Sequence, residues 1–103
     1  MLKLVGGYNT FEKVFRLYFD EVTDKFVDGW GKVYQNFDLK MLYKSLGKTS
    51  TDISASRFLI RQERSEWFCE YEKRYDEQTD LFIITYGQTP EEALHKCIEL
   101  IEV

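Results

Sequence analysis

Residues 89–103 read TPEEALHKCIELIEV, and this segment gives the clearest structural signal in the chain. Thr89 is suited to cap a helix, Pro90 to occupy its first position, and Glu92 to reach back towards the cap. Apolar side chains then recur at helical spacing, at Leu94, Cys97, Ile98 and Ile101. The run at 81–86 just before is apolar on both faces, as in a central strand. The C-terminal end of the chain is therefore predicted to form a strand, a turn and a helix.

Two more strands are expected upstream, at 58–61 and 67–72, joined by a polar turn at 63–65. Successive side chains of a strand point to opposite faces of its sheet. In the second strand, the side chains expected to face the core are Trp67, Cys69 and Tyr71. Those expected to face outward are Glu66, Phe68, Glu70 and Glu72. With the run at 81–86, these strands are predicted to form a three-stranded meander.

The segment at 10–27 has two interpretations. Its part at 14–19 is rich in aromatic and β-branched residues, which favours a strand. Over the whole segment the pattern is helical, because seven apolar residues fall within an arc of roughly 140° on a helix and only Leu17 clearly departs from it. These seven are Phe11, Val14, Phe15, Tyr18, Phe19, Val22 and Phe26. We predict a helix, since a period kept over four turns outweighs local composition. A β-hairpin with 26–34 is the alternative.

A second helix is predicted at 39–46, with Asp38 as its cap and Gly47 at its end. The segment at 50–53 is expected to be a turn or cap, and 30–34 a short extended piece or loop. The fold class predicted for residues 1–103 is a single α+β domain. It has a small antiparallel sheet of three to four strands, the fourth at 1–5, packed with an N-terminal helix pair and a C-terminal helix.

Charge is distributed unevenly along the chain. The net charge is −4, but residues 1–51 carry eight basic and six acidic side chains, whereas residues 52–103 carry six and twelve. An acidic second half disfavours direct binding to nucleic acid, which requires basic groups to neutralise phosphates. It suits a basic protein partner instead. Aromatic residues make up 17% of the chain, and some of them are expected on the surface, where they favour a partner interface.

The two cysteines, Cys69 and Cys97, lie in apolar patterns and are expected to be buried and reduced, as in a cytoplasmic protein. The short apolar stretch at 1–5 does not resemble a signal peptide. No apolar run has the length needed to span a membrane. The sequence therefore predicts a protein of the cytoplasm without a membrane partner.

Short landmarks in a fixed order resemble the phage ABA-sandwich domain family, small phage and prophage proteins of unestablished role. These landmarks are Asp28-Gly29-Trp30, Ser50-Thr51-Asp52-Ile53, Trp67-Phe68-Cys69, Thr89-Pro90-Glu91-Glu92-Ala93 and Lys96-Cys97. The ending at 86–102 is also similar to the strand–helix ending of HicB-type antitoxins. The resemblance implies a small accessory protein encoded by a phage or prophage, acting in a bacterial host. It implies no catalytic residues.

Catalytic and metal-binding patterns are weak. Glu91, His95 and Glu99 share one helix face, but ordinary pairing between residues four apart explains that spacing. Cys97 lies on nearly the opposite side of the same helix from His95, so the two cannot pair locally. We therefore expect no catalytic residue, no metal site, no cofactor and no enzymatic activity.

The predicted function is that of a non-enzymatic protein-binding module. Its expected binding residues are Glu66, Phe68, Glu70 and Glu72 on one strand, together with Trp30 and Tyr34. An apolar anchor among acidic groups suits a basic partner. In its most specific form the hypothesis is an inhibitor of a host defence nuclease. The alternative is an antitoxin-like or regulatory protein that neutralises a small partner and homo-oligomerises. A solvated, solubility-giving surface also accounts for the acidic strand, and a homodimer is compatible with either hypothesis.

Overall fold

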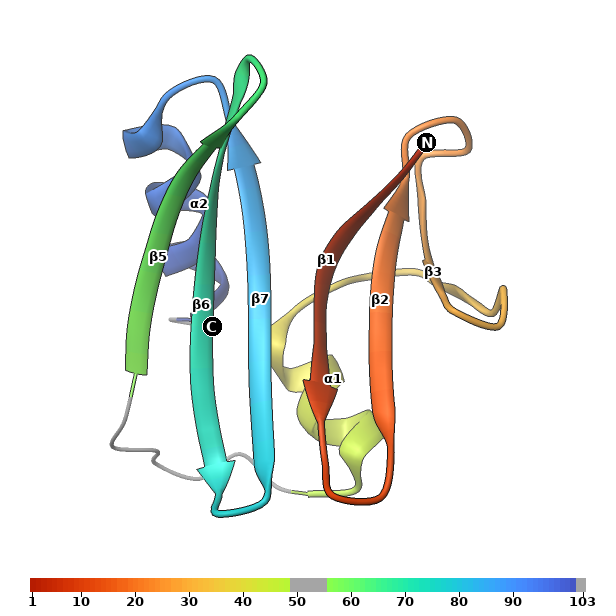
Figure 1. The fold of residues 1–103 in the computed structure, drawn as a ribbon. Coiled ribbons are helices and arrows are strands. Elements are labelled where there is room, and N and C mark those ends of the chain that lie inside the picture. The colour runs from red at the N-terminus through yellow and green to blue at the C-terminus, as the bar shows by residue number, and fades with distance from the viewer. Residues whose placement is uncertain (49–55, 102–103) are drawn as a thin grey trace.

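The main element of the fold is an antiparallel sheet of seven strands, in the spatial order β4-β3-β2-β1-β7-β6-β5 (Figure 1). The computed structural model describes residues 1–48 and 56–101. Its strands are β1 (Leu2–Asn9), β2 (Val14–Asp20), β3 (Lys25–Asp28), β4 (Val33–Tyr34), β5 (Ser56–Glu63), β6 (Glu66–Asp76) and β7 (Thr79–Gly87). Its helices are α1 (Leu39–Leu46) and α2 (Pro90–Ile101).

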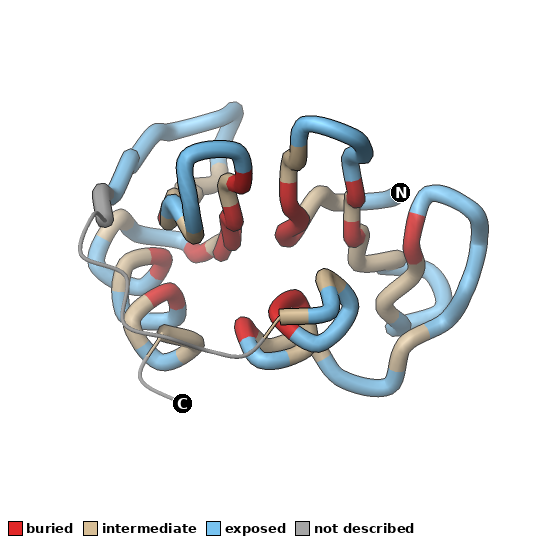
Figure 2. Tube along the Cα trace, turned by 90° about the horizontal axis from the view of Figure 1, so that it is seen from below, coloured by how far each residue is buried: buried red, intermediate tan, exposed pale blue. Residues whose placement is uncertain are grey.

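Both helices lie on the same face of the sheet, as Figure 2 shows in a view along the strands. The longer helix, α2, packs against β7, β6 and β5, and α1 contacts β1. The core fills the space between the sheet and these helices. Its fully buried side chains include Leu17, Leu42, Leu81, Ile83, Cys69 and Cys97. No helix among the described residues covers the opposite face, which is called the open face below.

The prediction of a helix at 10–27 is wrong, because this segment forms β2, a turn and β3. Phe11 and Val22, two members of the helical stripe, are 85% and 81% exposed, so the stripe is not a buried face. The buried pattern instead alternates, and Leu17, the residue that departs from the helical arc, has no exposed surface. Asp24 adopts a left-handed conformation, with φ at 59°, in the turn between the strands. The strand-forming composition at 14–19 therefore decides the structure.

The predicted fold class is contradicted as a result. The sheet has seven strands rather than three to four, and a single helix, α1, stands where an N-terminal helix pair is expected. Within this sheet, the extra strand expected at 1–5 is part of β1, and the three predicted strands of the meander are parts of β5, β6 and β7. The turn or cap predicted at 50–53 lies outside the described residues.

Both helices that the structure does contain have the ends that the sequence predicts. Asp38 Oδ1 accepts a hydrogen bond from the Met41 N–H at 2.7 Å, and Gly47 ends α1 in a left-handed conformation. Thr89 Oγ1 accepts one from the Glu92 N–H at 3.1 Å at the start of α2. The Glu92 carboxylate in turn accepts from the Gln88 N–H at 3.0 Å, one residue before the expected cap.

Cys69 and Cys97 meet in the core between β6 and α2, and both are free thiols without exposed surface. The predicted burial of both cysteines is confirmed. Burial and the neighbouring Cys69 raise the pKa of the Cys97 thiol to about 12. The same pair packs α2 against β6.

Candidate functional site: a cleft between two diverging strands

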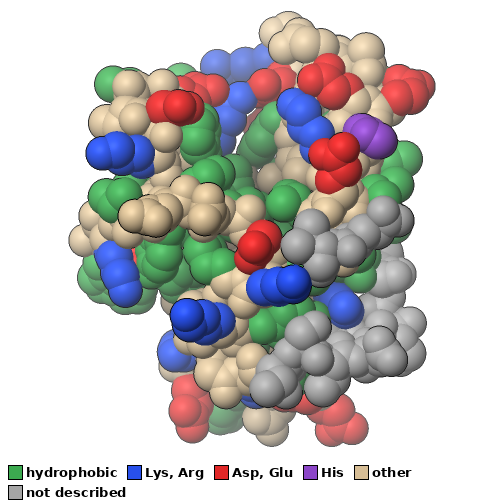
Figure 3. All heavy atoms as spheres, turned by 180° about the vertical axis from the view of Figure 1, so that it is seen from behind, with side chains coloured by type: hydrophobic (Ala, Val, Ile, Leu, Met, Phe, Trp, Pro, Cys, Tyr) green, Lys and Arg blue, Asp and Glu red, His purple; other side chains and the backbone are tan. Residues whose placement is uncertain are grey.

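The central strands β1 and β7 are paired over only part of their lengths. Gly6 to Asn9 of β1 pair with Ile83 to Asp80 of β7. On its other side, β1 has a register shift between Leu4 and Gly6 in its pairing with β2. Beyond Ile83 the two strands separate, as the gap between their ribbons in Figure 1 indicates. A cavity of about 680 Å³ lies where they separate. It opens on the side that carries the helices, which is the side seen in Figure 3.

One wall of this cleft is made of three phenyl rings. Phe19 comes from β2, Phe26 from β3 and Phe37 from the loop before α1. The ring centroids of Phe19 and Phe26 are 5.1 Å apart, and those of Phe26 and Phe37 are 5.8 Å apart. Phe37 approaches β1 closely because Gly6 has no side chain: an added Cβ there would lie 2.8 Å from the Phe37 ring. Val5, Ile84 and Leu100 extend the apolar lining.

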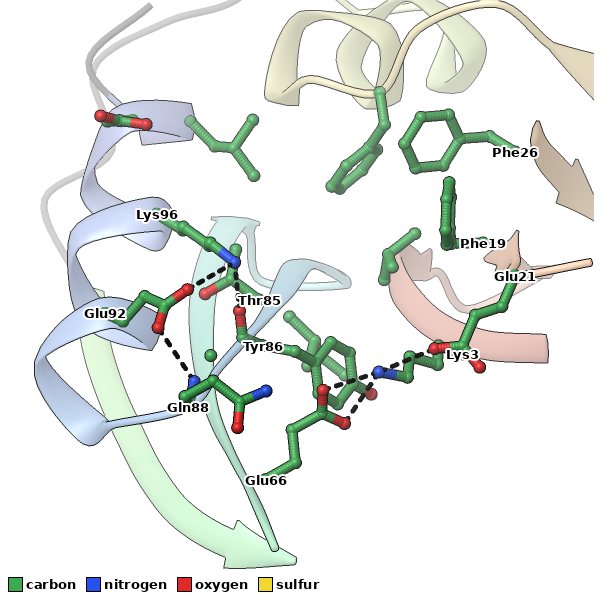
Figure 4. Close-up of a pocket in the computed structure, with 16 residues that line it drawn as sticks. Lys3, Phe19, Glu21, Phe26, Glu66, Thr85, Tyr86, Gln88, Glu92 and Lys96 are labelled. Carbon is green, nitrogen blue, oxygen red and sulfur yellow. Dashed lines mark hydrogen bonds and ion pairs between the residues drawn. The ribbon is translucent and has the colours of Figure 1, made fainter. Parts of the chain in front are cut away.

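The facing wall is formed by α2, from Glu92 to Leu100 (Figure 4). Lys96 Nζ lies 3.2 Å from Glu92 Oε1 and donates a hydrogen bond to the Tyr86 carbonyl at 2.8 Å. That carbonyl belongs to the part of β7 that has no partner residue in β1. The hydrogen bond from the Gln88 N–H and the Lys96 ammonium lower the pKa of Glu92. The ionised pair therefore joins the helix to the end of β7 that has no partner in β1.

Lys3 closes the remaining end of the cleft. Its ammonium donates to both carboxylate oxygens of Glu66 at 2.8 Å and lies 3.0 Å from Glu21 Oε1 (Figure 4). It also lies 4.7 Å from the centre of the Tyr86 ring, whose hydroxyl donates to the Leu4 carbonyl at 3.1 Å. Burial acts to lower the pKa of Lys3, but the two carboxylates outweigh it and raise that pKa. The contacts of Lys3 and Tyr86 bridge the two separated strands.

The cleft carries an excess of negative charge. Its lining includes four glutamates, Glu21, Glu66, Glu92 and Glu99, against the two lysines Lys3 and Lys96. Glu99 contacts His95 Nε2 at 3.0 Å, and its side chain is 65% exposed. A pocket with an apolar wall and a few polar groups at its rim is the usual form of a binding site. This one favours a ligand that has an apolar body and a cationic group.

The partner-binding residues predicted on β6 lie in two different parts of the structure. Glu66 lies in the cleft, whereas Phe68, Glu70 and Glu72 belong to the open face, opposite in register to residues of β7. Phe68 is half-buried, and its ring centroid is 6.2 Å from that of Tyr86. On its other side it pairs with Arg61 of β5. Phe68 therefore has a basic side chain beside it on the neighbouring strand, a feature that the sequence of β6 alone does not contain.

Trp30 and Tyr34 lie neither in the cleft nor beside Phe68 on β6. They belong to the loop and strand next to β3, at the opposite end of the sheet from β5 and β6. Trp30 is 81% exposed, whereas the Tyr34 hydroxyl is bonded to the buried Asp28 carboxylate at 2.9 Å. The structure therefore does not bring the six predicted binding residues together into one site.

Most of the cleft residues were not predicted from the sequence. They come from seven separate segments between Lys3 and Leu100, and the sequence contains no signal for the separation of β1 and β7. Glu91, His95 and Glu99 lie on α2 as expected. Among residues 1–48 and 56–101, no group of histidine, cysteine or acidic side chains is arranged to hold a metal ion.

Comparison of the chain with protein-family models, with curated proteins and with solved structures finds no match. The resemblance to the phage ABA-sandwich and HicB-type families therefore stays a prediction. In the part of the chain that the structure describes, no helix is long and apolar enough to cross a membrane.

Proposed function

We propose that this protein is a non-catalytic protein-binding module, and that its cleft receives an apolar side chain from a basic segment of a partner protein. The basic partner expected from the sequence is kept in this proposal. The proposed binding surface is now the cleft rather than the outward face of β6, and Glu66 belongs to both. A host defence nuclease with a basic surface is one partner that would fit this cleft.

The observation that carries the proposal is the combination of three phenyl rings with a glutamate excess around one cavity. Phe19, Phe26 and Phe37 offer apolar surface that a bound side chain can bury, which contributes roughly 25 cal/mol for each Å² removed from water. Carboxylates on two sides of the opening attract basic residues next to that side chain. Glu99 is the most exposed of them, with its side chain 65% accessible, and the side chains of Glu92 and Glu21 are 43% and 42% accessible.

A set of three capped tripeptides tests the proposal: Lys-Phe-Lys, Glu-Phe-Glu and Lys-Ala-Lys. Calorimetric titration should show that the first binds at least about tenfold more tightly than either control, a difference of roughly 1.4 kcal/mol. Amide chemical shifts should change at Gly87 and Gln88, which line the cleft. Equal binding of the three peptides, or shift changes centred on Phe68 and Glu70, would contradict the proposed site.

Variants then separate the contributions of charge and apolar surface. The double change Glu21→Gln with Glu99→Gln should weaken Lys-Phe-Lys binding at low salt, because it removes one exposed carboxylate of α2 and one that follows β2. Glu12→Gln with Glu77→Gln is the matched control, since both residues are exposed and lie outside the cleft. Phe37→Leu should weaken binding at every salt concentration, because it removes an aromatic ring but keeps apolar contact with Gly6.

A further inference from the structure

The strand β5 forms one edge of the sheet, and its outer side has no neighbouring strand among the described residues. All eight of its residues pair with β6, from Ser56 opposite Lys73 to Glu63 opposite Glu66, without a register shift. Three consecutive apolar side chains on it are accessible: Phe58 is 45% exposed, Leu59 37% and Ile60 38%. A long regular edge strand with exposed apolar residues is a template for pairing with another chain.

The two edges of the sheet differ in this respect. Soluble proteins protect their edges with short strands, prolines or bulges. The opposite edge, β4, is only two residues long, whereas β5 has neither a proline nor a bulge. The sheet therefore has a single edge that can pair over a full strand length.

We propose that β5 pairs in antiparallel orientation with β5 of a second copy of this chain. A twofold axis perpendicular to the sheet relates the copies, so each residue keeps its face. Phe58 and Ile60 then lie on the side that carries the helices, because they stand opposite Tyr71 and Cys69 of the core. Leu59 and Arg61 lie on the open face. The apolar residues of the two edges bury one another on both faces of the joined sheet.

The charges along β5 favour one register and a second copy as the partner. With the axis at Ile60, Leu59 stands opposite Arg61 of the other copy, whose aliphatic stem can cover it. An axis at Arg61 would instead place two like charges opposite each other, which is unfavourable.

Such pairing closes on itself. Each copy has one long edge and uses it once, and β4 is too short to continue the sheet, so the product is a dimer rather than a fibre. The cleft lies between β1, β7 and α2, while the paired edge is on the far side of β6 (Figure 1). The proposal is therefore independent of the proposed function, and both sites can be occupied together.

Sedimentation velocity on the wild-type protein and two edge variants tests the proposal. The wild-type protein should sediment as a dimer, with twice the monomer mass of 12.3 kDa. Ile60→Lys places a charge on the axis and should give a monomer with an unchanged circular dichroism spectrum. Leu59→Lys places a charge opposite Arg61 of the other copy on the open face, and this variant replaces Ile60→Lys if the latter fails to fold. Val22→Lys is the control, because Val22 is an exposed apolar residue in a turn away from β5, and it should remain a dimer.

A cysteine substitution tests the register. Oxidised Ile60→Cys should form a covalent dimer, because the two residues at position 60 face each other across the axis, whereas Gln62→Cys should form none. The native cysteines do not interfere, since both are buried. A wild-type monomer throughout the micromolar range, or a folded Ile60→Lys variant that remains a dimer, would overturn the proposal. Cross-linking through Gln62→Cys alone would overturn the register.

Discussion

The Tyr34 hydroxyl donates a hydrogen bond to Asp28 Oδ2 at 2.9 Å, and this bond fixes the loop between β3 and β4. Asp28 is only 8% exposed, and its Oδ1 also accepts from the N–H groups of Trp30 at 2.8 Å and Lys32 at 3.0 Å. Three donors around one buried carboxylate give the loop a defined shape. Trp30 is presented to solvent on a rigid support, whereas Tyr34 has a structural role.

Tyr34→Phe should destabilise the protein by about 1–3 kcal/mol, because it leaves a buried carboxylate with one donor fewer. The free energy of unfolding in urea measures the effect. Tyr18→Phe makes the same change in β2, two strands away, and removes no bond to Asp28, so its effect should be smaller. Equal stability of the Tyr34→Phe variant and the wild-type protein would show that the bond contributes nothing to the loop.

The stability difference between wild type and Tyr34→Phe should also depend on pH. Burial and the hydrogen bond to Asp28 raise the pKa of Tyr34 from 10.0 to about 12 in the folded protein. The unfolded chain therefore releases this proton first, and the contribution of Tyr34 is complete below pH 10 and is lost as the pH rises towards about 12. Urea unfolding of both proteins across this range should show the difference shrinking. A difference that stays constant would mean that Tyr34 titrates normally.

The helices could be predicted from the sequence because their capping residues lie close to their ends in the chain. Asp38 and Gly47 bound α1, and Thr89 bounds α2, because caps depend on residues within one turn of the helix. The helix prediction at 10–27 is wrong because its apolar residues fit a helical period, while three of the seven, Phe11, Val14 and Val22, are solvent-exposed. Leu17 carried the correct signal, since it fits only the alternating pattern.

The cleft could not be predicted in the same way. It exists because β1 and β7 separate after Gly6 and Ile83, and this depends on pairing between strands that are far apart in the chain. Glu66 was identified as a binding residue because it alternates with Trp67 on β6. Its partner Lys3 is 63 residues away, so no local pattern could connect the two. The position of Arg61 beside Phe68 on the open face could not be predicted for the same reason.

Gly7→Ala should disrupt the pairing of β1 with β2. An added Cβ at Gly7 would lie 2.2 Å from the Phe15 carbonyl oxygen, which belongs to the backbone of β2 and cannot move without breaking the sheet. We expect a loss of about 3 kcal/mol or more, in the range of severe overpacking. Gly29→Ala is the matched control, because nothing lies within 4 Å of its added Cβ. Thermal unfolding of both variants measures the difference, and equal melting temperatures would contradict this account.

The two thiols should be unreactive in the folded protein. Burial raises the pKa of Cys69, and burial together with Cys69 raises that of Cys97 to about 12, so little thiolate is present at mildly alkaline pH. A disulfide reagent should modify both cysteines in denaturant and neither without it. Cys69→Ala or Cys97→Ala should cost about 1–2 kcal/mol through lost packing. Rapid labelling of Cys97 in the native protein would contradict the packing of α2 on β6.

Lys3→Met should increase the affinity of the cleft for the Lys-Phe-Lys peptide. Lys3 holds Glu66 with two hydrogen bonds and also contacts Glu21, so its ammonium neutralises the carboxylates that a cationic ligand would meet. Replacing it with an apolar side chain of similar length leaves both carboxylates for the ligand. A single charge interaction of about 1 kcal/mol corresponds to a gain of roughly fivefold at low salt. Added salt should reduce this gain, because ions screen exposed charges.

Lys25→Met is the matched control for this change. Lys25 is exposed on β3 and does not line the cleft, so its replacement alters the net charge equally without freeing Glu66 or Glu21. Calorimetric titration of both variants separates a local effect from a general one. Equal gains in the two variants would attribute the effect to overall charge. A loss of affinity in Lys3→Met would mean that the Lys3 bridge between β1 and β6 is needed to hold the cleft open, and that Glu66 acts on the strands rather than on the ligand.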